Sequence, residues 1–201
     1  MTVLDLLSAD LFVALFVLIG WLVASRSASG MARRPGPAAI RRRATVALTA
    51  IVVSVSVVLV RVLLALALLD SGWWFVQETL VLGLPIQLVT AAAVLLLAVP
   101  RLRRLRRLAG QQAATSQDGA VAPTPELRLA AMHPLVLAPI RIALFGAIAA
   151  FLIVIVIGYP IGAADLAWVL LVLAAAGAVT SWLATRRWQL ARGGRRGRAH
   201  P

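Results

Sequence analysis

Residues 44–66 read ATVALTAIVVSVSVVLVRVLLAL, an apolar run in which Arg61 is the only ionisable side chain. A helix that crosses the hydrocarbon core of a bilayer needs about 20 such residues. The run is therefore long enough to span a membrane as one helix. We predict a transmembrane helix here, and we take its few polar side chains as the first candidates for function, because intramembrane polar groups are costly.

Four other stretches have the same length and character. They lie at about residues 4–24, 78–99, 137–159 and 164–184. Pro100 and Pro160 follow the second and third of these stretches, and we expect each proline to end its helix. The sequence therefore predicts an all-α fold, a polytopic integral membrane helix bundle with five transmembrane helices.

The overall composition supports this fold class. Hydrophobic residues make up 62% of the 201 residues, charged residues make up 13%, and the mean hydropathy is +0.95. A soluble domain carries about a quarter charged residues, and a disordered chain has low hydrophobicity. Both of these classes are therefore excluded.

Arginine is distributed unevenly between the connecting segments. All 20 basic residues are arginine, and 18 of them lie between spans one and two, between spans three and four, or after span five. Basic residues mark the cytoplasmic side of a membrane protein, so we predict an N-terminus outside and a cytoplasmic C-terminus. The charged side chains among the first ten residues are all acidic, whereas a signal peptide begins with positive charge. We therefore expect a retained span and not a cleaved signal peptide. Arginine without lysine suggests GC-rich coding and the cytoplasmic (inner) membrane of a bacterium.

The spans group into four predicted regions. We predict a three-helix transmembrane part at 1–109, a cytoplasmic linker at 110–127, a two-helix transmembrane part at 128–188 and a disordered basic tail at 189–201. The linker is polar and contains Pro and Gly, a composition typical of flexible connections.

A basic amphipathic segment, RLRRLRRL, ends the first part at residues 101–108. Leu102, Leu105 and Leu108 recur every three residues and share one helical face. We expect this segment to lie in the inner headgroup layer and to contact anionic lipid, through Arg101, Arg103, Arg104, Arg106 and Arg107. The simpler alternative is a stop-transfer cluster. We do not expect nucleic-acid binding, because each arginine cluster adjoins a span and topology accounts for it.

A candidate polar site lies between spans two and three. At a rise of 1.5 Å per residue, Ser54 and Gln87 both lie roughly 15 Å inside the membrane. Consecutive spans are usually neighbours, so we predict a hydrogen bond from Ser54 or Ser56 to Gln87. The alternative to a functional site is that such a bond is packing glue between helices.

Arg61 lies seven residues after Ser54 and returns to the same helical face. Its predicted partners are Glu78 and then Asp70 near the outer end of span three. The alternative is that Arg61 snorkels to the outer headgroups. If the Arg61–Glu78 pair forms, the effects of Arg61→Gln and Glu78→Gln should be strongly coupled.

Span three contains Gly83 and Pro85, and the proline is expected to kink it. Gly83, Gln87 and Thr90 fall on one face of this helix. Transporters often build a binding site at a broken helix with a polar residue at mid-depth. Proline and glycine are also simply common in membrane helices, so both interpretations stay open.

Two further features concern the second part of the chain. Spans four and five carry small residues at four-residue spacing, at Gly146 and Ala150 and at Gly177 and Ser181, which favours their close packing. His133 precedes Pro134 in a cytoplasmic segment. We expect a structural role for this histidine, with a proton relay as the alternative.

Residue types needed for most chemistry are missing. The chain has no cysteine and two histidines, so we predict no metal site, no cofactor and no catalytic residue. The motifs for nucleotides, serine nucleophiles and zinc are absent. We therefore expect a non-enzymatic accessory or structural subunit that contacts other membrane proteins. The alternatives are a small transporter or channel and, third, a lipid-modifying enzyme that uses Glu78 or His133.

Overall fold

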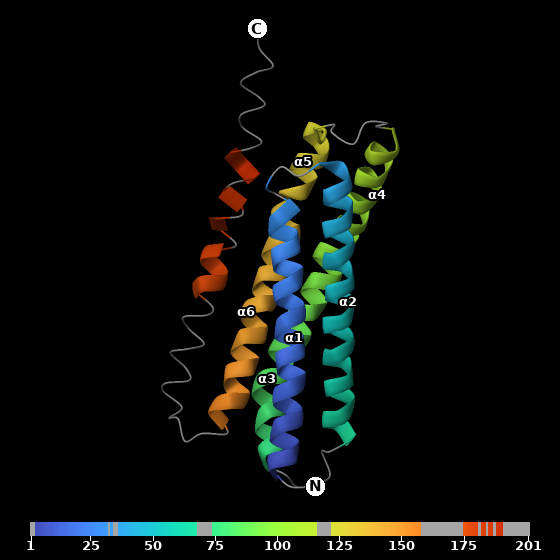
Figure 1. Cartoon of the computed structure of the whole chain (residues 1–201). Helices are drawn as coiled ribbons and strands as arrows, with labels where there is room; N and C mark the ends of the chain where they lie inside the picture. The colour runs from blue at the N-terminus through green and yellow to red at the C-terminus, as the bar shows by residue number, and fades with distance from the viewer. Residues whose placement is uncertain are drawn as a thin grey trace.

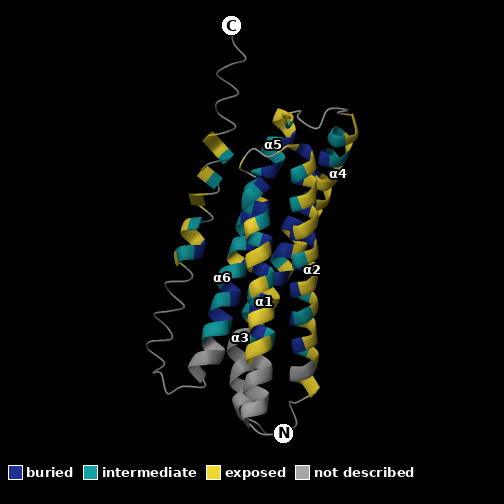
Figure 2. Ribbon diagram, viewed as in Figure 1, coloured by how far each residue is buried: buried dark blue, intermediate teal, exposed yellow. Residues whose placement is uncertain are grey.

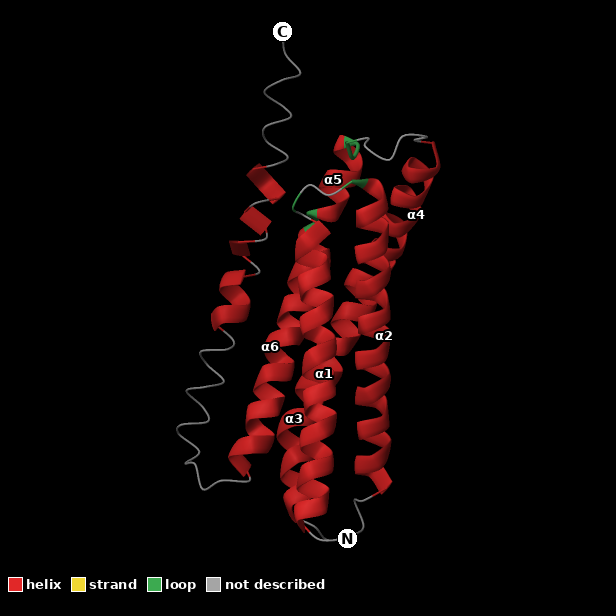
Figure 3. Cartoon of the chain, viewed as in Figure 1, coloured by secondary structure: helices red, strands yellow, loops and turns green. Residues whose placement is uncertain are grey.

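The computed structural model describes most of the chain. It describes residues 3–31, 33, 36–67, 74–115, 122–157, 175–180, 182–183, 185–186 and 188–190. Within the helices, only the backbone is described for residues 3–10, 64–65, 74–83 and 153–157. These residues contain helices and short loops but no strand (Figure 3).

The helices run up and down one elongated bundle (Figure 1). Their order is α1 (Val3–Met31), α2 (Pro37–Ala67), α3 (Trp74–Ala93), the π-helical turn η2 (Val94–Ala98), α4 (Val99–Thr115), α5 (Pro125–Ala131) and α6 (Pro134–Ile157). The end of α1, the start of α2, α4 and α5 gather at one end of the bundle. We call this the arginine-rich end.

Four described helices are long and apolar enough to cross a membrane. These are Leu11–Met31, Pro37–Leu63, Leu84–Thr115 and Pro125–Leu152. They overlap four of the five predicted spans, so an integral membrane protein is supported by length and composition. The fifth predicted span, 164–184, falls mostly outside the described residues.

The third of these helices does not end at Pro100, which is where the sequence had placed its end. It continues from α3 through η2 into α4. In η2 the N–H of Val99 donates to the carbonyl of Val94, five residues back, and this wider turn makes room for the ring of Pro100. The Arg101 side chain then donates to the Leu97 carbonyl at 2.7 Å, an oxygen close to the proline interruption. The helix therefore passes Pro100 unbroken.

The apolar face of α4 packs on protein. Leu102 and Leu105 are buried and belong to the core cluster, and α4 contacts α2, α5 and α6. Leu102 and Leu105 therefore face other helices of the bundle, and the predicted position of this segment in the headgroup layer stays a prediction. The segment extends the bundle, and α4 carries both buried and exposed residues (Figure 2), the exposed ones including Arg103, Arg104, Arg106 and Arg107.

The core of α1 and α2 follows a seven-residue repeat. In α2 the buried residues include Ile40, Ala47, Ser54 and Arg61 at one repeat position. In α1 they include Ala14, Val17, Trp21, Ala24, Ala28 and Met31. This spacing keeps one seam of each helix facing its neighbour, and the alanines let the two backbones approach closely.

Helices from both predicted transmembrane parts share this core. Helix α6 packs against α1 and α3, and its buried residues join the same cluster. The segment 175–180 lies beside α6, since the Arg141 side chain donates to the Thr180 carbonyl at 3.2 Å. Gly177 faces Phe145 of α6, as a Cβ there would lie 3.7 Å from its ring. Gly146, however, faces α3 and does not take part in this contact.

Part of the predicted linker is ordered. Helix α4 continues to Thr115, and α5 begins at Pro125 with Thr124 as its N-cap. The Gln112 side chain accepts from the Thr124 N–H at 3.3 Å and donates to the Ala122 carbonyl at 3.3 Å. One glutamine thus fixes the start of α5 against α4.

Candidate functional site

A buried polar pair joins α2 and α3 inside the bundle. The Arg61 Nη1 donates to the Gln87 Oε1 at 3.1 Å. Arg61 is 7% exposed and Gln87 is 3% exposed, so both are removed from lipid and water. The structure therefore brings Arg61 and Gln87 together. From the sequence, each of them had been predicted to pair with a different residue.

Gln87 has unused hydrogen-bonding capacity. A guanidinium only donates, so Arg61 fixes the amide oxygen toward itself and turns the amide nitrogen away. The Gln87 Nε2 has no hydrogen-bond partner among the described residues. Burying an amide donor without an acceptor costs about 1–3 kcal/mol, which marks this nitrogen as a place where a further acceptor would be stabilised.

Ser54 does not join this pair. Its Oγ donates to the Ala50 carbonyl of its own helix at 2.8 Å, and it faces Gly20 of α1. Ser56 is exposed. The predicted hydrogen bond from a serine to Gln87 is therefore wrong, because α1 and not α3 covers Ser54.

Thr90 also serves packing. Its Oγ1 donates to the Ile86 carbonyl at 2.8 Å and lies 3.1 Å from the Gln87 carbonyl. A Cβ on Gly146 would lie 3.2 Å from the Thr90 methyl and 3.3 Å from an Ile86 methyl. This glycine lets α6 approach α3 closely, so Thr90 holds two helices together and does not extend the polar pair.

Helix α3 is not interrupted at Pro85, and the predicted kink there stays a prediction. The structure places Trp74–Ala93 in one helix, with Pro85 inside it and its ring exposed. The side chain of Glu78 and the surroundings of Gly83 lie outside what the structure describes. The Arg61–Glu78 ion pair therefore stays a prediction.

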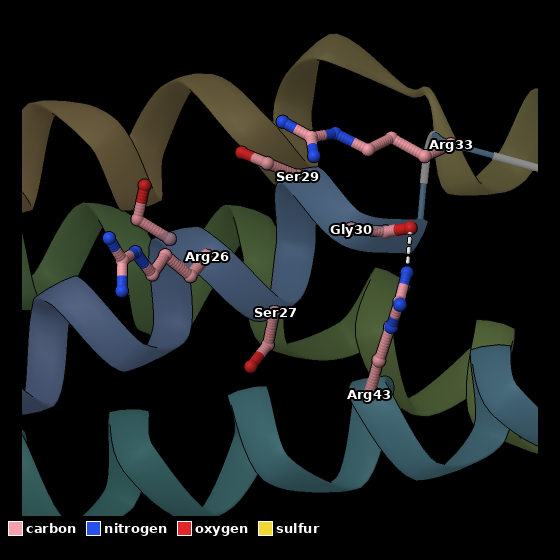
Figure 4. Close-up of a pocket in the computed structure, with 7 residues that line it drawn as sticks. Arg26, Ser27, Ser29, Gly30, Arg33 and Arg43 are labelled. Atoms are coloured by element: carbon pink, nitrogen blue, oxygen red, sulfur yellow. Dashed lines mark hydrogen bonds between the residues drawn. The ribbon is translucent and has the colours of Figure 1, made fainter.

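A polar pocket at the arginine-rich end was not predicted (Figure 4). It has a volume of about 890 Å³ and is lined by Ser25, Arg26, Ser27, Ser29, Gly30, Arg33 and Arg43. Most of these residues come from the last two turns of α1, whereas Arg43 rises from α2. On the sequence, these arginines served only to orient the chain. The alternating serines of SRSASG (25–30) were the signal that could have indicated the pocket.

His133 has two structural contacts. Its Nδ1 accepts the Leu135 N–H at 3.2 Å at the start of α6, and its ring lies 5.5 Å from the Trp188 ring. Both contacts fit the structural role expected for it. A histidine at this position satisfies one of the free N–H groups at a helix start.

Comparisons with protein families, with curated protein sequences and with solved structures find no match for this chain. Within the described ranges, no group of three His, Cys, Asp or Glu side chains is placed to hold a metal ion. Inferences about function therefore rest on the geometry of three features, which are the Arg61–Gln87 pair, helix α4 and the pocket at the arginine-rich end.

Proposed function

We propose that this chain is an accessory or structural subunit of a membrane complex that docks through the basic face of α4. The observation that supports the proposal is the placement of this face. Arg103, Arg104, Arg106 and Arg107 are all exposed, whereas Leu102 and Leu105 on the other side of the helix are buried. The arginines are thus held on a fixed helical surface.

The length of α4 supports docking outside the hydrocarbon layer. Helix α4 contributes 17 residues, which is roughly 25 Å of helix at 1.5 Å per residue. It follows the apolar helix α3 without a break. Its arginines would therefore stand at and beyond the headgroups, where an acidic surface of a partner or anionic lipid headgroups can meet them. Arg101 differs, since its side chain already donates to Leu97.

The bundle interior supports a non-enzymatic role. Ser54 and Thr90 bond to carbonyls of their own helices, and each packs against a glycine of a neighbouring helix. Their hydroxyl groups therefore contribute to helix association, and neither is paired with a base that would activate it.

The docking proposal is tested by native mass spectrometry of the full chain, purified from its own membranes in a lipid-retaining extractant. We expect a second protein at fixed stoichiometry. Arg103→Gln combined with Arg107→Gln should remove that protein. The matched control is Arg41→Gln combined with Arg42→Gln, which removes the same charge from exposed positions of α2. Equal loss in both variants, or no partner at all, would contradict the proposal.

A small transporter or channel is the second candidate, and the free Gln87 Nε2 favours it. Here Arg61 and Gln87 would contact a solute that carries an acceptor. Flux into reconstituted vesicles should then be lost in Gln87→Leu and kept in Val89→Leu, because Val89 is 69% exposed on the same helix. Flux that survives Gln87→Leu would remove this candidate.

We further propose five spans in a bacterial cytoplasmic membrane, with the N-terminus outside and the C-terminus inside. The chain contains no cysteine, so single-cysteine variants report topology directly. In intact cells, a membrane-impermeant thiol reagent should label Ser71→Cys and spare Gly36→Cys and Gly194→Cys. Gly36 is exposed, and a side chain there meets nothing within 4 Å. Labelling of Gly194→Cys from outside would show that the fifth span does not cross.

A further inference from the structure

The pocket at the arginine-rich end carries positive charge that its own lining does not neutralise. Among the residues that the structure describes, its charged side chains are Arg26, Arg33 and Arg43, and none of the lining residues is a carboxylate. Arg26 and Arg33 are exposed, and their guanidinium groups form no hydrogen bond or ion pair within the described part of the chain. Each guanidinium presents five N–H donors. The lining therefore attracts an anion.

Arg43 offsets the partial negative charge at the end of α1, which would otherwise repel an anion in the pocket. The last carbonyls of a helix carry partial negative charge, and α1 ends beside the pocket. The Arg43 Nη1 donates to the Gly30 carbonyl (Figure 4), so its charge offsets that of the helix end. A Cβ at residue 30 would lie 2.8 Å from this nitrogen, so glycine is what lets the guanidinium reach the backbone.

The serines add uncharged donors to the same lining. The Ser29 Oγ lies 3.4 Å from the Arg141 Nη2, which donates to it. A hydroxyl that accepts one hydrogen bond still has its own hydrogen to donate. Ser25 and Ser27 supply further hydroxyl groups at the pocket wall. Guanidinium and hydroxyl groups together are well suited to the oxygens of a phosphate group.

The surface next to the pocket is apolar and faces outward. Ile19, Leu22 and Val23 lie seven, four and three residues before Arg26, so they share its side of α1. They are 48%, 42% and 38% exposed. A phosphate bound at Arg26 therefore has an apolar strip directly beside it, running toward the middle of the span. A free phosphate ion gains nothing from this strip, whereas the acyl chains of a phospholipid can cover it.

We propose that this pocket binds the phosphate group of an anionic phospholipid, with its acyl chains lying along the exposed apolar face of α1. The excess of positive charge favours a phospholipid with a net negative charge over a zwitterionic one. This site is separate from the arginines of α4 and does not depend on the docking role proposed for them.

The test measures phosphatidylglycerol binding to the purified, delipidated full chain by native mass spectrometry. Arg26→Gln combined with Arg33→Gln should weaken binding roughly 30-fold, from the attraction that each arginine contributes near a membrane surface. Arg43 is kept, because it holds the end of α1. The matched control, Arg41→Gln combined with Arg42→Gln, should weaken binding less than about 3-fold, since these exposed arginines do not line the pocket.

Three competitors identify the source of the phosphate. Phosphatidylcholine, inorganic phosphate and a single-stranded oligonucleotide should each displace phosphatidylglycerol poorly from the unmodified chain. Displacement by inorganic phosphate at equal concentration would show a site for free phosphate, and displacement by the oligonucleotide would show a nucleic-acid surface. Equal weakening in the pocket variant and the control would show general surface charge. Each of these results overturns the proposal.

Discussion

Gln87→Leu is expected to lower the free energy of unfolding by about 1.5–3 kcal/mol, the usual worth of a hydrogen bond to a charged group. The substitution removes the oxygen that accepts from the buried Arg61 guanidinium and puts an apolar side chain against a charge. Hydrogen bonds between neutral side chains in membranes average only ~0.6 kcal/mol. The charge on the donor and the burial of both partners are the reasons to expect more here. Denaturation in mixed micelles, followed by tryptophan fluorescence, measures the change.

A double-mutant cycle separates this hydrogen bond from general packing. In an Arg61→Leu background there is no guanidinium to satisfy, so Gln87→Leu should cost less than about 0.5 kcal/mol or should stabilise the bundle. Val89→Leu is the control for added volume on an exposed face of α3. Equal costs of Gln87→Leu in both backgrounds would show that Arg61 does not depend on Gln87.

The positions of four long apolar helices could be predicted, because a candidate span is identified by hydropathy summed over about 20 residues. The run at 44–66 lies within α2 for that reason. Helix ends could not be predicted in the same way. A helix continues as long as packing supports it, and α4 contacts α2 and α5 and has Leu102 and Leu105 in the core cluster. The π-helical turn η2 then accommodates Pro100 without ending the helix.

The buried face of each span was harder to predict than the span itself. Lipid and the bundle core both favour apolar side chains, so a membrane helix can be hydrophobic all round. In α2, for example, Val52 and Val60 are exposed whereas Ile51 and Val58 are buried. Ser54 and Arg61 did mark the inner face, at 1% and 7% exposure, whereas Ser56 of the same helix is exposed.

The partners of these polar residues depend on the order of helices in the bundle. Helix α2 has two sequence neighbours, α1 and α3, and both are antiparallel to it. Ser54 was assigned to α3 from the sequence, although Gly20 of α1 was the small residue that could accept a serine close by. The pocket was missed for a related reason. Its arginines come from α1, from α2 and from the turn between them, and topology already explained their charge.

Gly20→Ala is expected to destabilise the bundle by about 1–3 kcal/mol, the range for overpacking a filled core. A Cβ at residue 20 would overlap the Ser54 Oγ and would lie 3.5 Å from the Ala50 carbonyl oxygen. The hydroxyl would have to rotate away and give up its 2.8 Å hydrogen bond to that carbonyl. Ser54 is 1% exposed, so it has no water to turn to. Denaturation in mixed micelles measures this change as well.

The sign of this effect should reverse when the hydroxyl is removed. In a Ser54→Ala background the nearest atom to the new methyl is the residue 54 Cβ at 3.4 Å, an ordinary contact. Gly20→Ala should then be neutral, or stabilising by up to about 1 kcal/mol through helix propensity. Gly110→Ala is the matched control, since its Cβ would meet only the Arg41 side chain at 3.8 Å and 3.9 Å; it should stabilise in both backgrounds. A cost at Gly20 that persists without the Ser54 hydroxyl would mean that the backbones of α1 and α2, and not the serine, set the closest approach of the two helices.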